Sequence, residues 1–347
     1  MEIKKLLLFF TLPFAVCFFS IELLVFLMKK HRKFQPIRMD GPETHQKKAK
    51  TPTMAGVAVT MAIALNILLF CDLNSPHMAV ALFLLMVFST IGLVDDIIKV
   101  FCNSANGFRG SYKLILQLFL TAIGIIYLCY RDTNYLDTGI TLPVFNAKVP
   151  LGVLTPAFYV LILCGSSNAA NFTDGLDGLL AIPVIMISTT LMAITILMSN
   201  GCSYSNVLPS EKVLHDIIIV MISVIAAFSG FFIYNKHPAK IFMGDVGSLM
   251  IGVLLCYTAI LLKVEILYAL MALLFVVEIL STTAQVTYFK VTGGKRLLKM
   301  APFHHHLEKI GWSEKRIVMF LWLLSFLCCV VAFTLFYYSL QCRWRVV

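Results

Sequence analysis

Charged residues are scarce in this sequence, at 13% of 347 residues, whereas soluble domains carry roughly 25%. Apolar residues make up 59% of the chain, and this excludes an ordinary water-soluble domain and indicates a polytopic membrane protein. The sequence has 18 acidic residues and 28 Lys and Arg residues, so its net charge is +10. Positive charge on a membrane protein usually lies in its cytoplasmic loops, so we expect no nucleic-acid partner.

The ten cysteines are scattered, mostly within apolar runs, and no CxxC pair occurs. Buried free thiols are therefore expected, rather than disulfides or a zinc site. An internal repeat and a low-complexity tail are also lacking, so residues 1–347 are interpreted as one integral membrane domain.

Apolar runs of about the length of a membrane span dominate the chain. The first run has no small-residue cleavage site at its end, so it is interpreted as a retained span and not a signal peptide. The sequence predicts an all-α protein with ten transmembrane helices, near 6–28, 53–71, 77–94, 114–130, 151–167, 179–199, 215–234, 247–262, 265–289 and 317–340.

The Lys and Arg residues are divided unequally between alternate loops. One set of loops carries 20 of the 28, and the positive-inside rule places that set in the cytoplasm and both termini on the periplasmic side. Among the external segments, 138–149 has β-branched residues and a turn candidate, so a small periplasmic hairpin is plausible there.

The segment 168–178 (NAANFTDGLDG) is polar and lies between two apolar runs. Asn168, Asn171, Asp174 and Asp177 recur every third residue, which would hold them near one face of a helical turn. Two carboxylates and two amides there could bind a hard cation with its phosphate, or line an ion path. A polar turn with ordinary helix caps is the alternative.

The cytoplasmic loop 39–56 combines helix breakers with lysines and hydroxyls, namely Lys47, Lys48, Lys50, Thr51 and Thr53. These residues could anchor a span to anionic lipid head groups or hold substrate phosphates.

Acidic residues mark two further loops on this side. The sequence GLVDDIIK ends the third span with Asp95 and Asp96, which could act as metal ligand and base or simply mark the interface. Asp96 and Lys99 are spaced to pair on a helix. In NKHPAKIFMGDVGS, Asp245 lies between two glycines, which suits an oxygen ligand, a phosphate-binding turn or a plain helix cap.

The longest cytoplasmic loop, 290–316, contains three consecutive histidines, His304, His305 and His306. Their directions on a helix diverge by about 100° each, so phosphate contact or proton transfer suits them better than one shared zinc ion. In the preceding span, Glu278 and Gln285 lie seven residues apart on one face, and an ionisable group there indicates function.

All these motifs fall on the same side of the membrane by the charge count, within loops 39–56, 92–113, 168–179, 235–249 and 290–316. Their aspartates would repel one another unless a divalent cation compensates, and oxygen ligands favour Mg²⁺ or Mn²⁺. We therefore expect phosphoryl transfer from a soluble diphosphate to an acceptor in the lipid phase. An ion-coupled transporter using Glu278 is a remote alternative, because its charges would lie near the bilayer centre.

The five motifs GPETHQKKAKTPTMAG, GLVDDIIK, NAANFTDGLDGL, NKHPAKIFMGDVGSL and PFHHHLE resemble those of the polyprenyl-phosphate N-acetylhexosamine-1-phosphate transferase superfamily. Within it, the chain is similar to the bacterial phospho-N-acetylmuramoyl-pentapeptide transferases. This resemblance implies a multi-pass protein of the bacterial plasma membrane, often a homodimer. It also implies a Mg²⁺-dependent reaction of UDP-MurNAc-pentapeptide with undecaprenyl phosphate, giving lipid I and UMP. A transferase of GlcNAc-1-phosphate is the alternative within the superfamily.

The resemblance also implies roles for individual residues. It places catalysis at Asp95, Asp96, Asp245 and His304, with Asp245, and Asp95 or Asp96, as metal ligands. It implies substrate contacts for Lys48, Thr53, Lys113, Asn171, Asp174, Gly175, Leu176, Asp177, Asn235, Phe242, Gln285, Ala301, His305 and His306. Two departures, Lys50 and Ala55, leave the backbone shape of their loop open. Direct in-line attack and a two-step route through an aspartyl intermediate both remain open.

Overall fold

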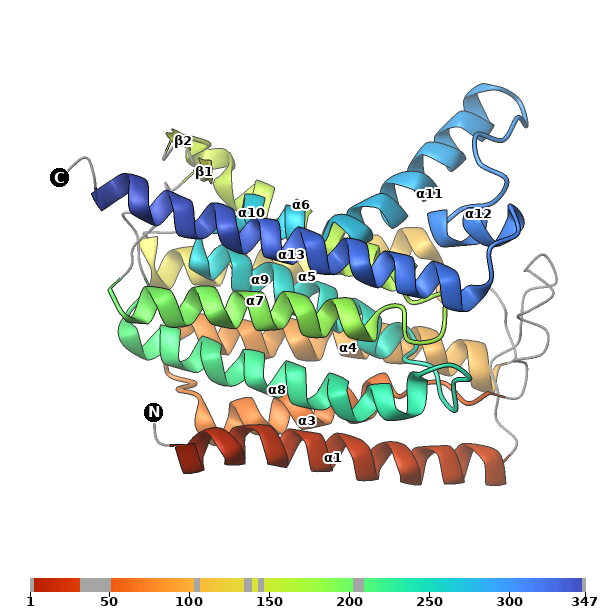
Figure 1. The fold of residues 1–347 in the computed structure, drawn as a ribbon, viewed down its shortest axis with the longest axis horizontal. Coiled ribbons are helices and arrows are strands. Elements are labelled where there is room, and N and C mark those ends of the chain that lie inside the picture. Colours follow the sequence, from red (N-terminus) through yellow and green to blue (C-terminus); the bar gives the residue numbers. More distant parts are fainter. Residues whose placement is uncertain are drawn as a thin grey trace.

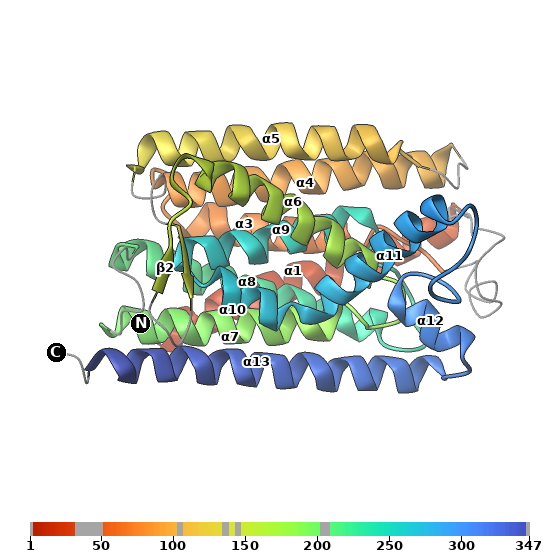
Figure 2. The same ribbon diagram turned by 90° about the horizontal axis from the view of Figure 1, so that it is seen from above.

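The computed structural model describes residues 3–31, 51–102, 107–133, 139–142, 147–201 and 209–344. Most of them form helices that run side by side along one direction (Figure 1, Figure 2). The elements are α1 (Ile3–Lys30), α3 (Gly56–Phe70), α4 (Pro76–Phe101), α5 (Gly110–Arg131), β1 (Ile140–Leu142), β2 (Ala147–Val149), the 3₁₀ turn η2 (Gly152–Leu154), α6 (Thr155–Thr173), α7 (Ala181–Ser199), α8 (Glu211–Asn235), α9 (Asp245–Leu262), α10 (Glu265–Met271), α11 (Leu273–Val291), α12 (Phe303–Lys309) and α13 (Glu314–Trp344).

Eight of the described helices are long and apolar enough to cross a membrane. The number rises to nine if α10 and α11, which meet at an angle of 78°, form one bent span. Helix α3 is apolar but has only 15 residues. The predicted multi-pass helical protein is therefore confirmed, while the count of ten remains a prediction.

The two ends of the bundle differ. At one end, β1 and β2 pair antiparallel with Ile140 opposite Val149, which confirms the predicted hairpin. Helix α1 begins and α13 ends at this same end, whereas α11 and α12 lie toward the other end (Figure 1, Figure 2).

Helix α9 forms the centre of the bundle, and every residue from 246 to 262 is buried. Helices α3, α4 and α6 pack against it. Each of these three contacts includes a glycine whose missing side chain lets two backbones touch, so a Cβ there would overlap backbone atoms of the neighbour. The contacts are Gly56 with Gly247, Gly92 with Asp245, and Gly252 with Ser166. The first turn of α9 is therefore held firmly between its neighbours.

Candidate active site

Three carboxylates from distant parts of the chain meet at one end of the central helix. Asp95 and Asp96 lie in the last two turns of α4, and Asp245 is the first residue of α9. One oxygen from each lies within 4.8 Å of the others. Asp95 and Asp96 are only 2% and 1% exposed. The expectation that distant aspartates meet is confirmed for these three.

The adjacent aspartates face different partners, as their directions on a helix require. Asp95 Oδ1 accepts the backbone N–H of Phe108 at 2.6 Å, so Asp95 faces the loop that leads to α5. Asp96 faces α9, where its Oδ2 accepts the N–H of Val246 at 3.1 Å. Its buried Oδ1 has no hydrogen-bond partner among the described residues, and neither does the buried hydroxyl of Thr53.

Two lysines compensate the negative charge. Lys99 Nζ lies 2.5 Å from Asp95 Oδ2 and 3.2 Å from Asp245 Oδ2. Lys113 Nζ lies 2.5 Å from Asp245 Oδ2 and 3.8 Å from Asp95 Oδ2. The expected Asp96–Lys99 pair was wrong, because Lys99 pairs with Asp95 while the Asp96 carboxylate faces α9. The predicted Lys113 lies within the site.

The donor set suits a hard divalent cation. Three carboxylates at this separation offer the oxygen ligands that Mg²⁺ and Mn²⁺ prefer. The unpartnered Oδ1 of Asp96 is a buried acceptor that an ion would satisfy. The residues present therefore fit the implied metal.

Asn171 links the carboxylates to the end of α6. Its Nδ2 donates to Asp245 Oδ1 at 2.9 Å and to Ser248 Oγ at 2.8 Å. Three residues later, burial together with the charges of Asp245 and Asp96 raises the pKa of Asp174 to about 8. Asp174 is therefore electrostatically part of the same site.

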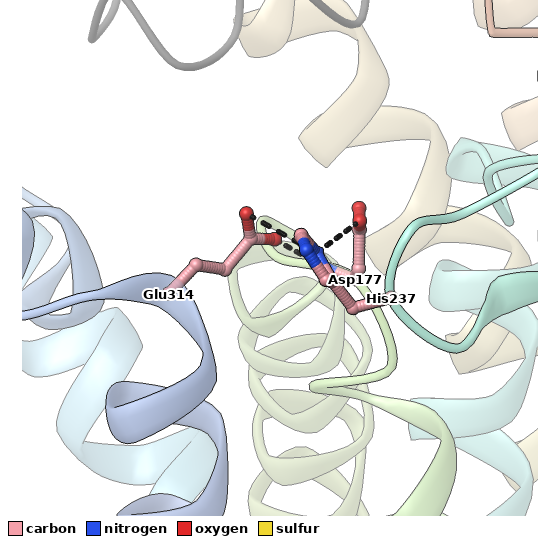
Figure 3. Close-up of side chains that lie close together, drawn as sticks. All are labelled: Asp177, His237 and Glu314. Carbon is pink, nitrogen blue, oxygen red and sulfur yellow. Dashed lines mark hydrogen bonds and ion pairs between the residues drawn. The ribbon is translucent and has the colours of Figure 1, made fainter.

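The loop after Asp174 is held by side chains from other helices. The buried Asp177 carboxylate accepts from His237 Nδ1 and from the backbone N–H of Ala239, both at 3.0 Å. The Asp177 N–H donates to Glu314 Oε1 at 3.0 Å. Figure 3 shows how His237 lies between the two carboxylates, each on a different segment.

Two residues predicted to line a nucleotide pocket have other contacts in this structure. Asn235 is buried, and its side chain accepts from Gly178 N–H and donates to the Ile241 carbonyl, both at 3.0 Å. It thereby fixes two loops to each other. Phe242 is half-buried, and its backbone pairs with Pro52 and Ala55. Ala55 fits this pairing with an ordinary φ of −57°.

The first histidine of the predicted motif points into the protein. His304 is 1% exposed, and its Nδ1 lies 3.1 Å from Oε2 of the buried Glu278. Its Nε2 side abuts Gly175, where a Cβ would overlap the imidazole. Gly175 is thus required for close approach of the 174–178 loop to His304.

The following histidines face other neighbours. His305 Nδ1 lies 2.6 Å from Glu308 Oε2, and burial lowers the pKa of His305 despite that carboxylate. His306 Nδ1 accepts the N–H of Lys299 at 3.2 Å. Gln285 accepts the backbone N–H groups of Leu297 and Leu298 at 3.1 and 2.8 Å, so it braces the loop before α12.

Three predicted residues remain. Leu176 is buried beside Asp177, and Ala301 precedes α12. Lys48 lies outside the described residues. The sequence reasoning missed His237, Glu314 and Trp322, which all contact the 174–178 loop. The only sequence signal for Glu314 was that it is an acid in the first turn of a helix. Acids are common at that position, so the signal did not indicate a role in the site.

Comparison with known proteins places the chain in a family. Residues 78–263 match the model of glycosyl transferase family 4. The phospho-N-acetylmuramoyl-pentapeptide-transferases of Rickettsia felis and Rickettsia canadensis are each 40% identical over 306 residues, covering 87% of this chain and 84% of the relative. That of Rickettsia akari is 39% identical over the same extent. With its buried carboxylate site on the ends of α4 and α9, the chain belongs to glycosyl transferase family 4 and, within it, to the phospho-N-acetylmuramoyl-pentapeptide-transferases.

Proposed function

We propose that this protein transfers phospho-MurNAc-pentapeptide from UDP-MurNAc-pentapeptide to undecaprenyl phosphate, giving lipid I and UMP. The observation that carries the proposal is the cluster of Asp95, Asp96 and Asp245 with two lysines, in a chain of this family. Such a cluster suits phosphoryl transfer, where catalysis is mostly positioning and charge stabilisation.

Asp245 and Asp96 would hold a Mg²⁺ ion, which when bound would neutralise the diphosphate and the UMP leaving group. Asp95 removes the proton of the lipid phosphate. An oxygen of that phosphate then attacks the phosphorus attached to the sugar, in line with the bond to UMP. The new P–O bond forms as the old one breaks, and UMP leaves with the former bridging oxygen. The contacts of Asp95 with Lys99 and Phe108 fix the direction of its carboxylate.

The nucleotide is proposed to lie over the 171–178 loop, against Phe242 and the α12 histidines. This placement is supported by the bond from Asn171 to Asp245 and by the contact of Gly175 with His304. Lys48, Thr53 and Gln285 are proposed to contact the phosphates or the sugar-peptide part.

Ten membrane spans are proposed, comprising the eight long apolar helices, the bent α10–α11 pair and α3, with both termini in the periplasm. The positive charge of the alternate loops supports this orientation and a cytoplasmic site in the bacterial plasma membrane. The proposed homodimer rests on family membership and is tested by the mass of the purified protein in nanodiscs.

The reaction is tested with purified protein, radiolabelled UDP-MurNAc-pentapeptide and undecaprenyl phosphate, with and without Mg²⁺. We expect a lipid-extractable product and UMP only when the metal is present. Product from UDP-GlcNAc, but not from the pentapeptide nucleotide, would contradict the proposal. Full turnover by Asp95→Asn across pH would contradict the assignment of Asp95 as the base.

A further inference from the structure

The 174–178 loop has two faces with different neighbours. One face abuts His304 at Gly175, and the loop follows Asn171, which donates to Asp245 of the carboxylate site. The other face is bound by side chains that the catalytic proposal does not use. They come from the segment after α8 and from the start of α13.

Helix α13 holds the loop at two adjacent residues. Glu314 accepts the Asp177 N–H at 3.0 Å, and Trp322 Nε1 donates to the Gly178 carbonyl at 3.2 Å. The two α13 residues are eight positions apart, so they project from one face of the helix.

The last residue of α8 and the segment after it hold the same two residues from the other side. Asn235 accepts the Gly178 N–H, while His237 Nδ1 lies 3.0 Å from Asp177 Oδ2. His237 Nδ1 also lies 3.7 Å from Glu314 Oε2, so one imidazole joins both carboxylates (Figure 3). Three side chains therefore bond to the backbone at 177 and 178, and a fourth, His237, bonds to the Asp177 carboxylate.

From this arrangement we infer that His237 and Glu314 are positioning residues that hold the 174–178 loop in the shape required by the uridine nucleotide. The inference rests on the proposed function. Asp95, Asp96 and Asp245 lie on α4 and α9, which do not include either residue. Removing the contacts of His237 or Glu314 with the loop should weaken nucleotide binding, while the carboxylates of Asp95, Asp96 and Asp245 keep their geometry.

The test compares Glu314→Ala, Glu314→Gln and His237→Phe in the full-length protein with Mg²⁺. Glu314→Ala removes a charged acceptor from a backbone N–H, so the KM for UDP-MurNAc-pentapeptide and the inhibition constant of UMP should both rise about tenfold to a hundredfold. We expect kcat and the KM for undecaprenyl phosphate to change by less than about threefold. Glu314→Gln keeps an acceptor oxygen and should restore most of the nucleotide affinity. His237→Phe keeps a ring but loses the donor to Asp177, and it should raise the nucleotide KM.

Lys315→Ala and Lys236→Ala are matched controls, since both lysines are exposed neighbours in sequence. Equal changes in kcat and in both KM values, or no rescue by Glu314→Gln, would overturn the positioning role. So would binding of one Zn²⁺ by the wild type that His237→Phe loses, because the three side chains would then form a metal site. A wild type without transferase activity would instead refute the proposed function, which separates the two failures.

Discussion

Gly92→Ala tests whether the packing of α4 against α9 sets the geometry of the catalytic carboxylates. Gly92 lies one turn before Asp95 and Asp96, and its Cα faces the carbonyl of Asp245 and the nitrogen of Val246. A Cβ at this position would overlap those atoms. They belong to the backbone of a buried helix, so they cannot rotate away as a side chain could.

Restoring ordinary van der Waals contact requires the two helices to move apart by about 1 Å. Because α4 carries two of the carboxylates and α9 carries the third, the whole displacement appears between the proposed metal ligands. A misplacement of about 1 Å can lower a rate about a hundredfold, which corresponds to about 2.7 kcal/mol of transition-state stabilisation. Overpacking is also expected to lower the free energy of unfolding by about 1–3 kcal/mol.

The assay is kcat at saturating nucleotide and lipid phosphate, with a Mg²⁺ titration and a thermal unfolding curve on the same preparation. Gly165→Ala is the control, because a Cβ on this α6 glycine meets no atom within 4 Å. We expect the control to retain wild-type turnover. The reasoning is refuted if folded Gly92→Ala keeps kcat and the Mg²⁺ requirement within about threefold of the wild type.

Three further predictions concern the metal, the pH and the bundle. Asp245→Asn should raise the Mg²⁺ concentration for half-maximal activity at least about tenfold, and an unchanged titration would exclude Asp245 as a ligand. Since burial raises the pKa of Asp174 to about 8, this carboxyl is mostly protonated at pH 7 and gains its charge as the pH rises. Calorimetric Mg²⁺ binding should therefore tighten from pH 7 to pH 9, and pH-independent binding would contradict this. Asn66→Ala removes hydrogen bonds from Asn66 Nδ2 to the Phe9 carbonyl and to Ser223 Oγ, at 3.0 and 2.6 Å. It should cost about 1–2 kcal/mol of stability and lower Tm, whereas an unchanged Tm would show that this link between α1, α3 and α8 is dispensable.

The convergence of distant motifs was predictable from charge alone. Counting Lys and Arg places every acidic motif on one side of the membrane, and like charges confined to one face require a cation or lysines nearby. The structure confirms that Asp95, Asp96 and Asp245 meet. Sequence spacing could not decide whether Lys99 pairs with Asp95 or Asp96, because both spacings are neighbours on a helix.

Features that depend on tertiary contact were not predictable. The partly polar run 265–289 was predicted as one span, but the helix is broken between Met271 and Leu273 and bends by 78°. Asn235 was predicted to contact the nucleotide, and this contact stays a prediction. That its amide also joins Gly178 to Ile241 could not be predicted, because these partners are distant in sequence or lie in a loop.

The site consists of two parts that are held by different helices. The carboxylates are fixed by glycine-mediated packing of α4 on α9, and the 174–178 loop is fixed by hydrogen bonds from α13 and the segment after α8. If these two supports are independent, the double variant Gly92→Ala with Glu314→Ala should show the kcat of the first and the nucleotide KM of the second. Effects at independent sites add within about 0.5 kcal/mol, or roughly a factor of two in each kinetic parameter. A larger deviation, measured by steady-state kinetics on all four proteins, would mean that α9 and α13 transmit strain to each other. The division of the site into the catalytic carboxylates and a separately held nucleotide-binding loop would then be wrong.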